Sequence, residues 1–367
     1  HGWCHFSSLS DRVEVATVGA LGRLEYQQPT DYIAERYTGD LVRCASRALD
    51  FAVTPNHVML VSWCGNVGRW RSVRRVRADA MKAGHVLPVA PSRDDVEARY
   101  YIHVPGMEGK VALEDWAEFL GWFVSEGSTS GAFSERQERR HEISLSQNAG
   151  TEKSDQIAAL LARLPIHSRH HGQTFFMQNL ELWTYLRTLG NVYGKHLPEA
   201  VFFWPLFAQE RLWEALVAGD GTIHNGQRMY FTASERWADD VTRLLTVMGR
   251  VFTKRQRTTS GSMIRGRPVG PGTTWLVTER QTTWAYLMNG HHDGLVRREP
   301  YDGMVYCVTV PNGTLVTRRN GKPLLAGNCL RYWAIGDWSY RGLLAVQAGR
   351  VVTIGARRTG VNSRVGW

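Results

Sequence analysis

The chain is best interpreted from three stretches near its end, Val305-Tyr306-Cys307-Val308-Thr309-Val310, Asn320-Gly321-Lys322-Pro323 and Gly327-Asn328-Cys329. Short β-like runs lead here to an Asn directly before a Cys. The carboxamide of such an Asn can attack its own backbone carbonyl and break the peptide bond once the Cys thiol carries an acyl group. Asn-Cys is a common dipeptide, so its meaning depends on the rest of the chain.

The composition favours a polyanionic partner. The 367 residues include 44 Lys and Arg against 34 Asp and Glu, a formal charge of +10, and such an excess favours nucleic acid first. The five cysteines lie far apart without a CxxC spacing, which indicates a reducing, cytoplasmic location rather than a disulfide framework or zinc site. No apolar run approaches membrane-spanning length and no signal-peptide pattern is present, so we expect no membrane partner. The chain does not begin with Met, as expected for a fragment or a processed protein.

The order of local patterns suggests one domain inserted into another. Up to about Val61, short β-like runs alternate with Gly-containing turns, and short strands return after Tyr301. Between them, from Leu113 to about Leu245, helical patterns dominate. The length of the chain allows two or three domains.

A turn that could assist cleavage of a peptide bond follows the apolar run Leu49–Val53. In Thr54-Pro55-Asn56-His57, a Thr and a His three residues apart can point at one peptide group. The imidazole of His57 can then polarise or protonate a scissile amide while the hydroxyl of Thr54 orients it. An ordinary turn with a surface His is the alternative.

The start of the chain offers two nucleophiles. The stretch Ser8-Leu9-Ser10-Asp11-Arg12-Val13-Glu14-Val15-Ala16-Thr17 resembles the opening block of inteins without a gap and places Ser8 at its first position. A hydroxyl is a weaker nucleophile than a thiol, and Cys4 lies only four residues upstream. Ser8 is the preferred first nucleophile and Cys4 the alternative.

Together, the opening block, the Thr-x-x-His turn and the closing stretch resemble the Hint splicing domain of inteins and hedgehog proteins, over about Ser8–Val61 and Tyr301–Cys329. The resemblance implies an all-β horseshoe that brings both splice junctions together. In that family, residues at the matching positions perform an acyl shift (Ser8), assist it (Thr54 and His57), accept the acyl chain (Cys329) and cyclise (Asn328). Cys307 stands where the family has Asp or Cys beside the active centre, or is a small buried residue on a strand.

One residue departs from the intein pattern. Most inteins carry His before the terminal Asn, and Gly327 stands there in this chain. Gly has no side chain that could donate a proton, so another group must assist the cyclisation of Asn328 or the reaction must run slowly.

Two similar segments lie in the helical part of the chain. Phe119–Gly127 and Trp213–Gly221 are apolar helix patterns with small residues, and each ends in an acid followed by Gly. Small residues let two helices pack closely, so that the two terminal acids, Glu126 and Asp220, meet at the end of the interface. Two carboxylates in that arrangement can hold divalent cations.

These repeats resemble the LAGLIDADG homing endonucleases, over about Leu113 to His291. The resemblance implies an α+β domain with two pseudo-symmetric αββαββα halves, whose two sheets lie over the major groove of double-stranded DNA. Glu126 and Asp220 would bind Mg²⁺ and cut both strands. Lys195, in a stretch that looks like the family's Lys-x-x-Pro block, would approach the scissile phosphate or lie on a solvated turn.

The two resemblances imply a monomeric protein in five parts. Residues 1–7 and 329–367 would be flanks of a host protein (exteins), 8–100 the first part of the Hint domain with a basic linker, 101–295 the endonuclease and 296–328 the rest of the Hint domain. The expected activities are autocatalytic protein splicing and Mg²⁺-dependent cleavage of a homing site. The alternatives are an endonuclease domain that binds DNA without cutting, a free-standing DNA-binding protein that does not splice, and hedgehog-like cleavage without ligation.

Overall fold

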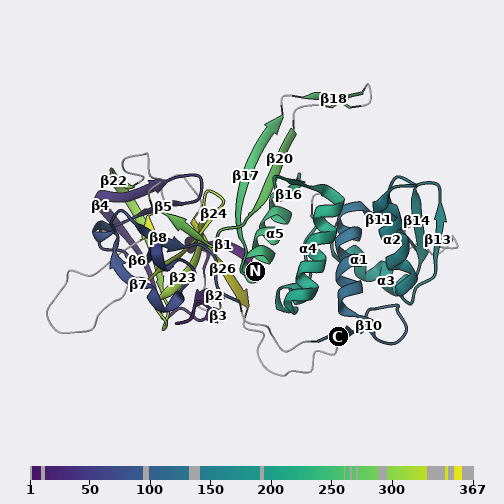
Figure 1. Ribbon diagram of the computed structural model, residues 1–367, viewed down its shortest axis with the longest axis horizontal. Coiled ribbons are helices and arrows are strands. Elements are labelled where there is room, and N and C mark those ends of the chain that lie inside the picture. The colour runs from purple at the N-terminus through teal and green to yellow at the C-terminus, as the bar shows by residue number, and fades with distance from the viewer. Residues whose placement is uncertain are drawn as a thin grey trace. The chain divides into compact units, whose positions relative to one another are not determined.

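The computed structural model describes residues 2–9, 13–93, 99–131, 141–190, 194–259, 261–264, 267–269, 272–287, 296–328, 344–345 and 351–357. The chain divides into two compact units. Unit 1 contains His1–Asp94, Leu245–Arg255 and Glu279–Val361, and unit 2 is built mainly from Asp95–Leu244 and Gln256–Thr278. Unit 2 therefore interrupts unit 1 along the sequence (Figure 1).

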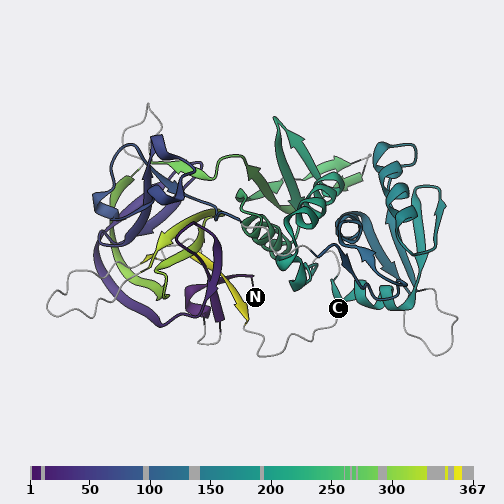
Figure 2. The same ribbon diagram turned by 60° about the horizontal axis from the view of Figure 1, so that its bottom comes forward.

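Unit 1 is built from β-strands with short 3-10 turns among its described residues (Figures 1 and 2). The main path of its large sheet has the order β21-β8-β6-β24-β23-β26-β2-β3, with β1 paired to β26 and β7 paired to β6. These strands are β1 (Gly2–His5), β2 (Val13–Val18), β3 (Leu24–Gln27), β6 (Val58–Trp63), β7 (Arg74–Arg77), β8 (His85–Pro88), β21 (Trp284–Tyr286), β23 (Thr314–Arg319), β24 (Lys322–Gly327) and β26 (Val351–Arg357).

A second group of strands in unit 1 forms a closed barrel in the order β22-β25-β5-β4. Its strands are β4 (Asp31–Ala45), β5 (Asp50–Val53), β22 (Val296–Thr309) and β25 (Leu344–Ala345). The two long strands, β4 and β22, pair from Asp31↔Thr309 to Cys44↔Val296. This ladder joins residues from both ends of the chain and encloses an apolar core that includes Leu41, Phe51 and Val305.

A buried carboxylate ties the barrel to the β23–β24 hairpin. Asp50 Oδ1 accepts hydrogen bonds from Arg43 Nη1 at 2.8 Å and Arg319 Nη1 at 3.1 Å. Asp50 Oδ2 accepts from Asn320 Nδ2 at 3.1 Å and lies 3.7 Å from Lys322 Nζ. A charge that is only 5% exposed requires such partners, because an unpaired buried ion is strongly unfavourable. Asp50 therefore fixes the turn from which β24 starts.

Unit 2 contains two similar halves (Figures 1 and 2). The first half consists of α1 (Leu113–Glu126), β11 (Gly127–Ser130), β12 (Glu142–Ser146), α2 (Glu152–Arg163), β13 (Ser168–His171), β14 (Thr174–Gln178) and α3 (Leu180–Thr188). The second consists of α4 (Leu206–Asp220), β15 (Gly221–His224), β16 (Gln227–Thr232), α5 (Glu235–Val247), β17 (Val251–Thr259) and β20 (Gly272–Arg280). The end of α5, the start of β17 and the last two residues of β20 are grouped with unit 1. The sheets have the equivalent orders β11-β12-β14-β13 and β15-β16-β20-β17, so the duplication extends to topology.

The remaining elements of unit 2 are short. They are β9 (Tyr101–Ile102), β10 (Val111–Ala112), the 3-10 turn η5 (Glu199–Phe203), and β18 (Ser262–Ile264) with β19 (Arg267–Val269) between β17 and β20. Two of the helices begin at the residues that their sequences favour. Thr151 caps α2 by accepting from Ser154 N, and Asn179 caps α3 by accepting from Leu182 N.

Helices α1 and α4 pack against each other at their small residues. A Cβ added to Gly121 of α1 would lie 2.5 Å from Ala215 Cβ and 2.9 Å from Leu212 O of α4. A Cβ added to Gly219 of α4 would lie 2.3 Å from Ser125 Cβ of α1. The two helices can therefore approach this closely only because these side chains are absent.

Two features differ from the expectations from sequence. The first half of unit 2 has the expected αββαββα order, but among the described residues no helix follows β20 in the second half. The chain continues there into β21, which pairs with β8. In addition, β26 comes from the segment expected to be host flank, and yet it pairs with β1, β2 and β23 in the large sheet of unit 1.

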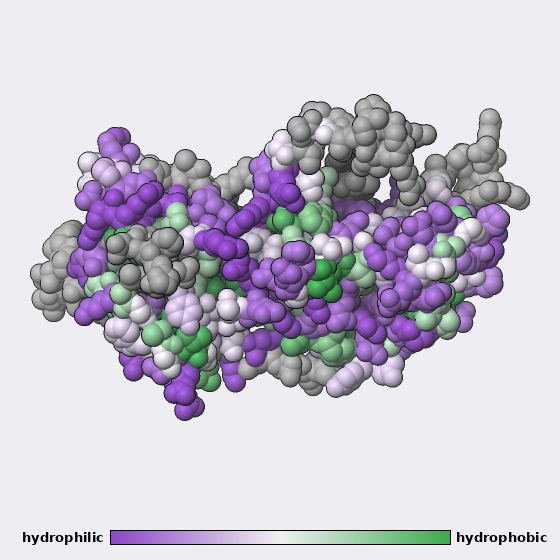
Figure 3. Space-filling view, turned by 45° about the horizontal axis from the view of Figure 1, so that its top comes forward, coloured by the Kyte–Doolittle hydropathy of each residue, from purple (hydrophilic) through white to green (hydrophobic). Residues whose placement is uncertain are grey.

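On the face that Figure 3 shows, hydrophilic residues cover most of the described surface and hydrophobic areas are small. No helix in the described part of the chain is long and apolar enough to cross a membrane.

We predict that Gly121→Val destabilises unit 2 by about 1–3 kcal/mol, because added methyl groups in a closely packed interface force the backbone or neighbouring side chains to shift. Urea unfolding of the full chain measures the change. Gly65→Val is the matched control, because no atom lies within 4 Å of a Cβ at that position. Equal stability of the two variants would contradict the close contact of α1 with α4.

Candidate functional site

The two predicted acids lie at equivalent places in the two halves of unit 2. Glu126 is the last residue of α1 and Asp220 is the last residue of α4. Because the two helices pack along their small residues, both carboxylates lie in the same region. The charge of Glu126 raises the pKa of Asp220, and the charges of both acids act to raise the pKa of Lys195. Asp220 lines a cavity of about 390 Å³. The structure therefore brings the two acids together.

Lys195 lies in the same cavity as Asp220. Its Nζ donates a hydrogen bond to Val124 O in the last turn of α1. Burial lowers the pKa of Lys195, while the charges of Asp220 and Glu126 act in the opposite direction. Of the two interpretations that the sequence left open, the structure thus supports the position beside the acids and not the solvated turn.

The environment of Asp220 favours its protonated form. The protein atoms around this carboxyl and the charge of Glu126 raise its pKa to about 6, against the opposing effects of Lys195, Lys153 and the nearby Tyr230. The carboxyl nevertheless remains accessible to solvent at the mouth of the cavity. A cation bound nearby would stabilise the ionised form of this carboxyl group, which the negative charge of Glu126 disfavours.

Sequence reasoning missed two side chains that lie beside the acids. Gln147, just after β12, donates from Nε2 to Glu126 Oε1 at 3.3 Å. Tyr230, on β16, lies opposite Gly221, the residue after Asp220, and lines the same cavity as Asp220. No repeated spacing in the sequence marks them, because Gln147 and Tyr230 stand at different distances from the two acids and reach the site through strand pairing.

The donor set fits Mg²⁺ or a similar divalent cation. Mg²⁺ is commonly held by one or two carboxylates, with water and substrate phosphate completing the coordination, and Glu126 and Asp220 supply two carboxylates beside an open cavity. Among the described residues there is no cluster of three or more His, Cys, Asp or Glu that could form a closed metal cage. The site is therefore suited to a cation that shares its coordination with a substrate.

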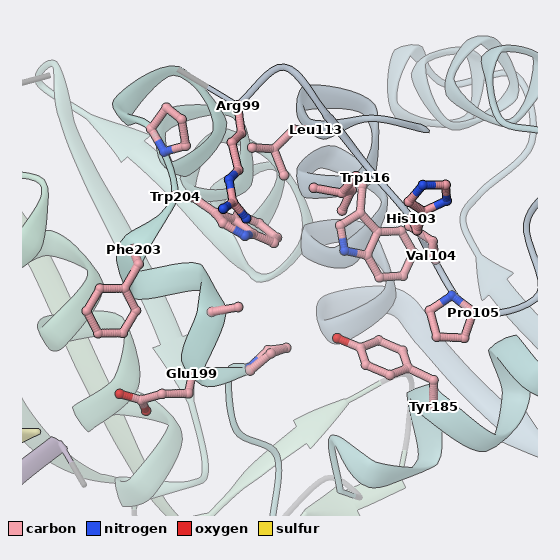
Figure 4. A pocket seen from close by; sticks show the side chains of 14 residues that line it. Arg99, His103, Val104, Pro105, Leu113, Trp116, Tyr185, Glu199, Phe203 and Trp204 are labelled. Atoms are coloured by element: carbon pink, nitrogen blue, oxygen red, sulfur yellow. The ribbon is translucent and has the colours of Figure 1, made fainter. Parts of the chain in front are cut away.

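A larger cavity elsewhere in unit 2 has a different character. It has a volume of about 760 Å³, and Trp116, Tyr185, Phe203 and Trp204 are among its lining residues (Figure 4). None of Glu126, Asp220 and Lys195 lines it. The polar head of Glu199 at its edge is paired with Arg243. The aromatic cavity is therefore separate from the paired acids, despite its greater size.

In unit 1, the predicted Thr-x-x-His turn forms. Thr54 follows β5 directly and is buried, and its carbonyl oxygen accepts a hydrogen bond from His57 N at 3.0 Å. His57 is completely buried, and its carbonyl accepts from Ala78 N at 2.8 Å. Both side chains are thus held inside the unit, and His57 is not the surface residue of the alternative interpretation.

Asn328 lies next to this turn. Strands β24 and β6 are antiparallel with Ala326 opposite Met59, and continuing that register places Asn328 opposite His57. Asn328 is completely buried, and its Nδ2 donates to Val310 O at 3.0 Å. Among the described residues nothing donates to Asn328 Oδ1. A buried carboxamide oxygen without a donor lowers the stability of the folded state by roughly 1–3 kcal/mol, so the packing around Asn328 must offset this cost.

The geometry explains the glycine before Asn328. A Cβ at Gly327 would lie 2.6 Å from both Val58 O and Val58 Cγ1. Backbone and side chain of β6 therefore occupy the space that any larger residue would need. The packing of β24 on β6 therefore requires glycine at position 327, where most inteins have histidine.

The candidate nucleophiles at the start of the chain lie in different environments. Cys4 is half-buried in β1, and burial raises the pKa of its thiol. Ser8 is exposed at the end of η1 (Phe6–Ser8). Phe6, two residues before Ser8, packs in the same apolar core as Cys307 and Val310.

This core links the start of the chain to the site of Asn328, because Val310 is the residue whose carbonyl Asn328 binds. Cys307 is buried on β22. Cys329 lies outside the described residues.

Comparison with known proteins gives partial likenesses. No family model matches the chain. The chain is 26% identical over 317 residues to an ATP-dependent Clp protease proteolytic subunit of Chlamydomonas moewusii, covering 77% of this chain and 30% of that protein. It is 25% identical over 384 residues to a DNA-directed RNA polymerase subunit beta C-terminal section of Stigeoclonium helveticum, covering 89% of this chain and 35% of that protein. The chain thus spans about a third of the length of the curated relatives it matches.

Solved structures of the homing endonuclease I-DmoI are also similar. Mesophilic variants of I-DmoI match 46% of this chain and 89% of theirs, with 12% identity and a TM-score of 0.33. I-DmoI in complex with DNA and Mn matches 46% and 90%, with 11% identity and a TM-score of 0.31. At such low values the function has to be argued from the sites themselves.

The raised pKa of Asp220 makes a prediction about stability in the metal-free protein. The folded state holds the proton of Asp220 more tightly than the unfolded state, so ionised Asp220 lowers stability above about pH 6, and this cost disappears below the ordinary value of 3.8. Asp220→Asn should raise the free energy of unfolding at pH 7.5 by about 1 kcal/mol, after discounting for solvent exposure, and leave it unchanged near pH 3.5.

Urea unfolding in the presence of EDTA at both pH values measures this difference. Glu214→Gln on the same helix is the control, because this exposed acid pairs with Arg211 and Arg228 and its loss should cost a few tenths of a kcal/mol. A loss of stability in Asp220→Asn at pH 7.5 would show that the folded state does not raise the pKa of Asp220.

Proposed function

We propose that the chain carries a self-splicing intein with an inserted DNA endonuclease of the LAGLIDADG type. The endonuclease part is supported chiefly by the symmetric placement of Glu126 and Asp220 at the ends of two closely packed helices, with Lys195 beside them. The splicing part is supported chiefly by the position of buried His57 opposite buried Asn328. The proposed parts are those predicted from the sequence, with 101–295 as the endonuclease.

Double-stranded DNA is the proposed substrate of unit 2. The chain has a formal charge of +10, and exposed Arg169 on β13 and Arg257 on β17 lie on the two sheets that follow the paired acids. Basic side chains on such sheets would bind phosphates, and neighbouring side chains would contact base edges. The pseudo-symmetry of the two halves suits a duplex, whose strands are themselves related by local two-fold symmetry.

In the proposed cleavage reaction, Glu126 and Asp220 would hold divalent cations. When bound, such a cation lowers the pKa of a water molecule and stabilises charge on the scissile phosphate. Lys195 would place its positive charge near the same phosphate oxygens. Gln147 would keep the carboxylate of Glu126 in position.

In the proposed splicing reaction, Ser8 Oγ attacks the carbonyl carbon of Ser7, and the amide nitrogen of Ser8 leaves to give an ester. The Cys329 thiol then attacks that ester carbonyl and releases the Ser8 hydroxyl, which forms a thioester. Asn328 Nδ2 attacks its own carbonyl carbon and breaks the bond to Cys329. A final shift of the acyl group from sulfur to nitrogen leaves a normal peptide bond. Thr54 and His57 would orient and protonate the first amide.

The curated relatives fit an inserted element. One is named as a protease subunit and the other as an RNA polymerase subunit, and each is matched over only about a third of its length. A segment shared by two proteins with different names is expected of an element that moves between host genes. A free-standing DNA-binding protein would not need a buried His57 and a buried Asn328 at the end of the same strand ladder.

We predict that the full chain cuts DNA in which the natural codons for residues 1–7 join directly to those for residues 329–367. Glu126→Gln and Asp220→Asn should each lower the rate at least about 100-fold, because loss of a metal ligand costs more than loss of an outer contact. Gel analysis of labelled duplex in Mg²⁺ measures cleavage, and binding in Ca²⁺ should be retained. Binding without cleavage by the unaltered chain would instead indicate an inactive endonuclease.

We also predict that expression of the chain yields a ligated product of residues 1–7 with 329–367, detectable by mass spectrometry. Asn328→Ala should prevent release at the second junction. Ser8→Ala should abolish cleavage at the first junction, whereas Cys4→Ala should leave it intact, because Cys4 is half-buried and burial raises the pKa of its thiol. The reverse result would make Cys4 the first nucleophile, and released flanks without ligation would indicate hedgehog-like cleavage.

A further inference from the structure

The ring of Trp3, near the start of the chain, contacts two side chains of unit 1. It meets the ring of Phe252 edge-on, with the ring centroids 6.2 Å apart and the planes at 68°. The guanidinium carbon of Arg318 lies 4.5 Å from the centroid of the Trp3 ring. A cation is attracted to the face of an aromatic ring, and more strongly where water is excluded. Arg318 is only 6% exposed, so this condition is met.

The backbone around Trp3 and the far side of its ring are also bound to unit 1. Strand β1 pairs with β26 over its whole length. The Trp3 ring packs against an apolar cluster that includes Val316 of β23 and Leu325 of β24. Strand β24 ends directly before Asn328. The first residues of the chain are therefore bound to the same sheet that leads to Asn328.

These contacts concern a residue that the proposed splicing reaction would transfer. Trp3 precedes both candidate nucleophiles, Cys4 and Ser8, so it belongs to the host flank whichever of the two reacts. A flank that only had to leave the splicing unit would need no packed side chain. An aliphatic residue could fill the space beside the apolar cluster, but it would offer no aromatic face to Arg318. The packing of Trp3 therefore indicates recognition of the flank through its ring.

We propose that Trp3 is a specificity-determining residue, through which unit 1 recognises the host flank by an aromatic side chain at this position. Arg318 and Phe252 form the surface that binds the ring. This inference rests on the proposed splicing function. Binding of the flank restricts the motion of the peptide bond at the first junction and holds it near the attacking group, which speeds an intramolecular reaction. A host protein with an aliphatic residue at this position would be a poor substrate.

The test follows cleavage at the first junction in the full chain with Asn328→Ala, which keeps the second junction closed. Hydroxylamine attacks the ester of Ser8 or the thioester of Cys4 and releases the flank as a hydroxamate, which mass spectrometry measures. Trp3→Leu keeps an apolar side chain without a ring, and we expect it to slow release at least about tenfold. Trp3→Phe keeps an aromatic face and should release the flank within about threefold of the parent rate. Trp63→Leu is the matched control and should not change the rate, because Trp63 is an exposed tryptophan of the same unit outside the flank.

A double variant separates recognition from damage to the fold. Trp3→Leu combined with Arg318→Gln should be no slower than the slower single variant, because both changes remove the same contact, whereas independent damage would multiply the two effects. Circular dichroism checks that each variant is folded. Unchanged release by Trp3→Leu, or equally slow release by Trp3→Phe, would overturn recognition of the ring and leave the splicing function standing. No release from the Asn328→Ala chain itself would overturn the proposed splicing function.

Discussion

The close approach of α1 to α4 is the constraint on which the arrangement of unit 2 depends. Gly121 faces Ala215 and Gly219 faces Ser125 at distances that leave no room for further atoms. Each helix ends in its acid, and the next residue already begins a strand. One packing contact therefore sets the separation of Glu126 from Asp220 and also the points from which the two sheets start. A change in the packing of α1 on α4 would therefore shift both the candidate metal site and the candidate DNA surface.

In unit 1, strand register brings together residues that are distant in the sequence. In the ladder between β24 and β6, Ala326 lies opposite Met59, and this register, if continued by two residues, brings Asn328 opposite His57. The carboxylate of Asp50 fixes the hairpin from which β24 starts. Asn328 belongs to the last residues of the predicted splicing element and His57 to the first sixty residues of the chain, so they meet only after long-range pairing. In both units, residues distant in sequence are brought together by backbone geometry rather than by contacts between the reactive side chains themselves.

The sequence was most informative where local pattern and chemistry coincide. Glu126 and Asp220 were predicted because the same helix pattern with a terminal acid occurs twice, and the Thr54–His57 turn because its spacing is local. Gln147 could not be found in this way, since its contact with Glu126 depends on where β12 ends relative to α1. The sequence left the position of Lys195 open because a turn residue can point to solvent or inward. The pairing of β26 within unit 1 was missed because a short strand carries no signal of its partner.

The glycine at position 327 illustrates how packing constrains chemistry. The sequence alone shows the loss of a side chain that could assist Asn328, whereas the structure shows that Val58 fills the space where that side chain would lie. Restoring a histidine at 327 would therefore push β24 away from β6 and disturb the register that places Asn328 opposite His57. In the proposed reaction, help for Asn328 must come from a neighbouring strand, and His57 is the titratable side chain that the register brings opposite it. The same packing that excludes one proton donor thus secures the position of another.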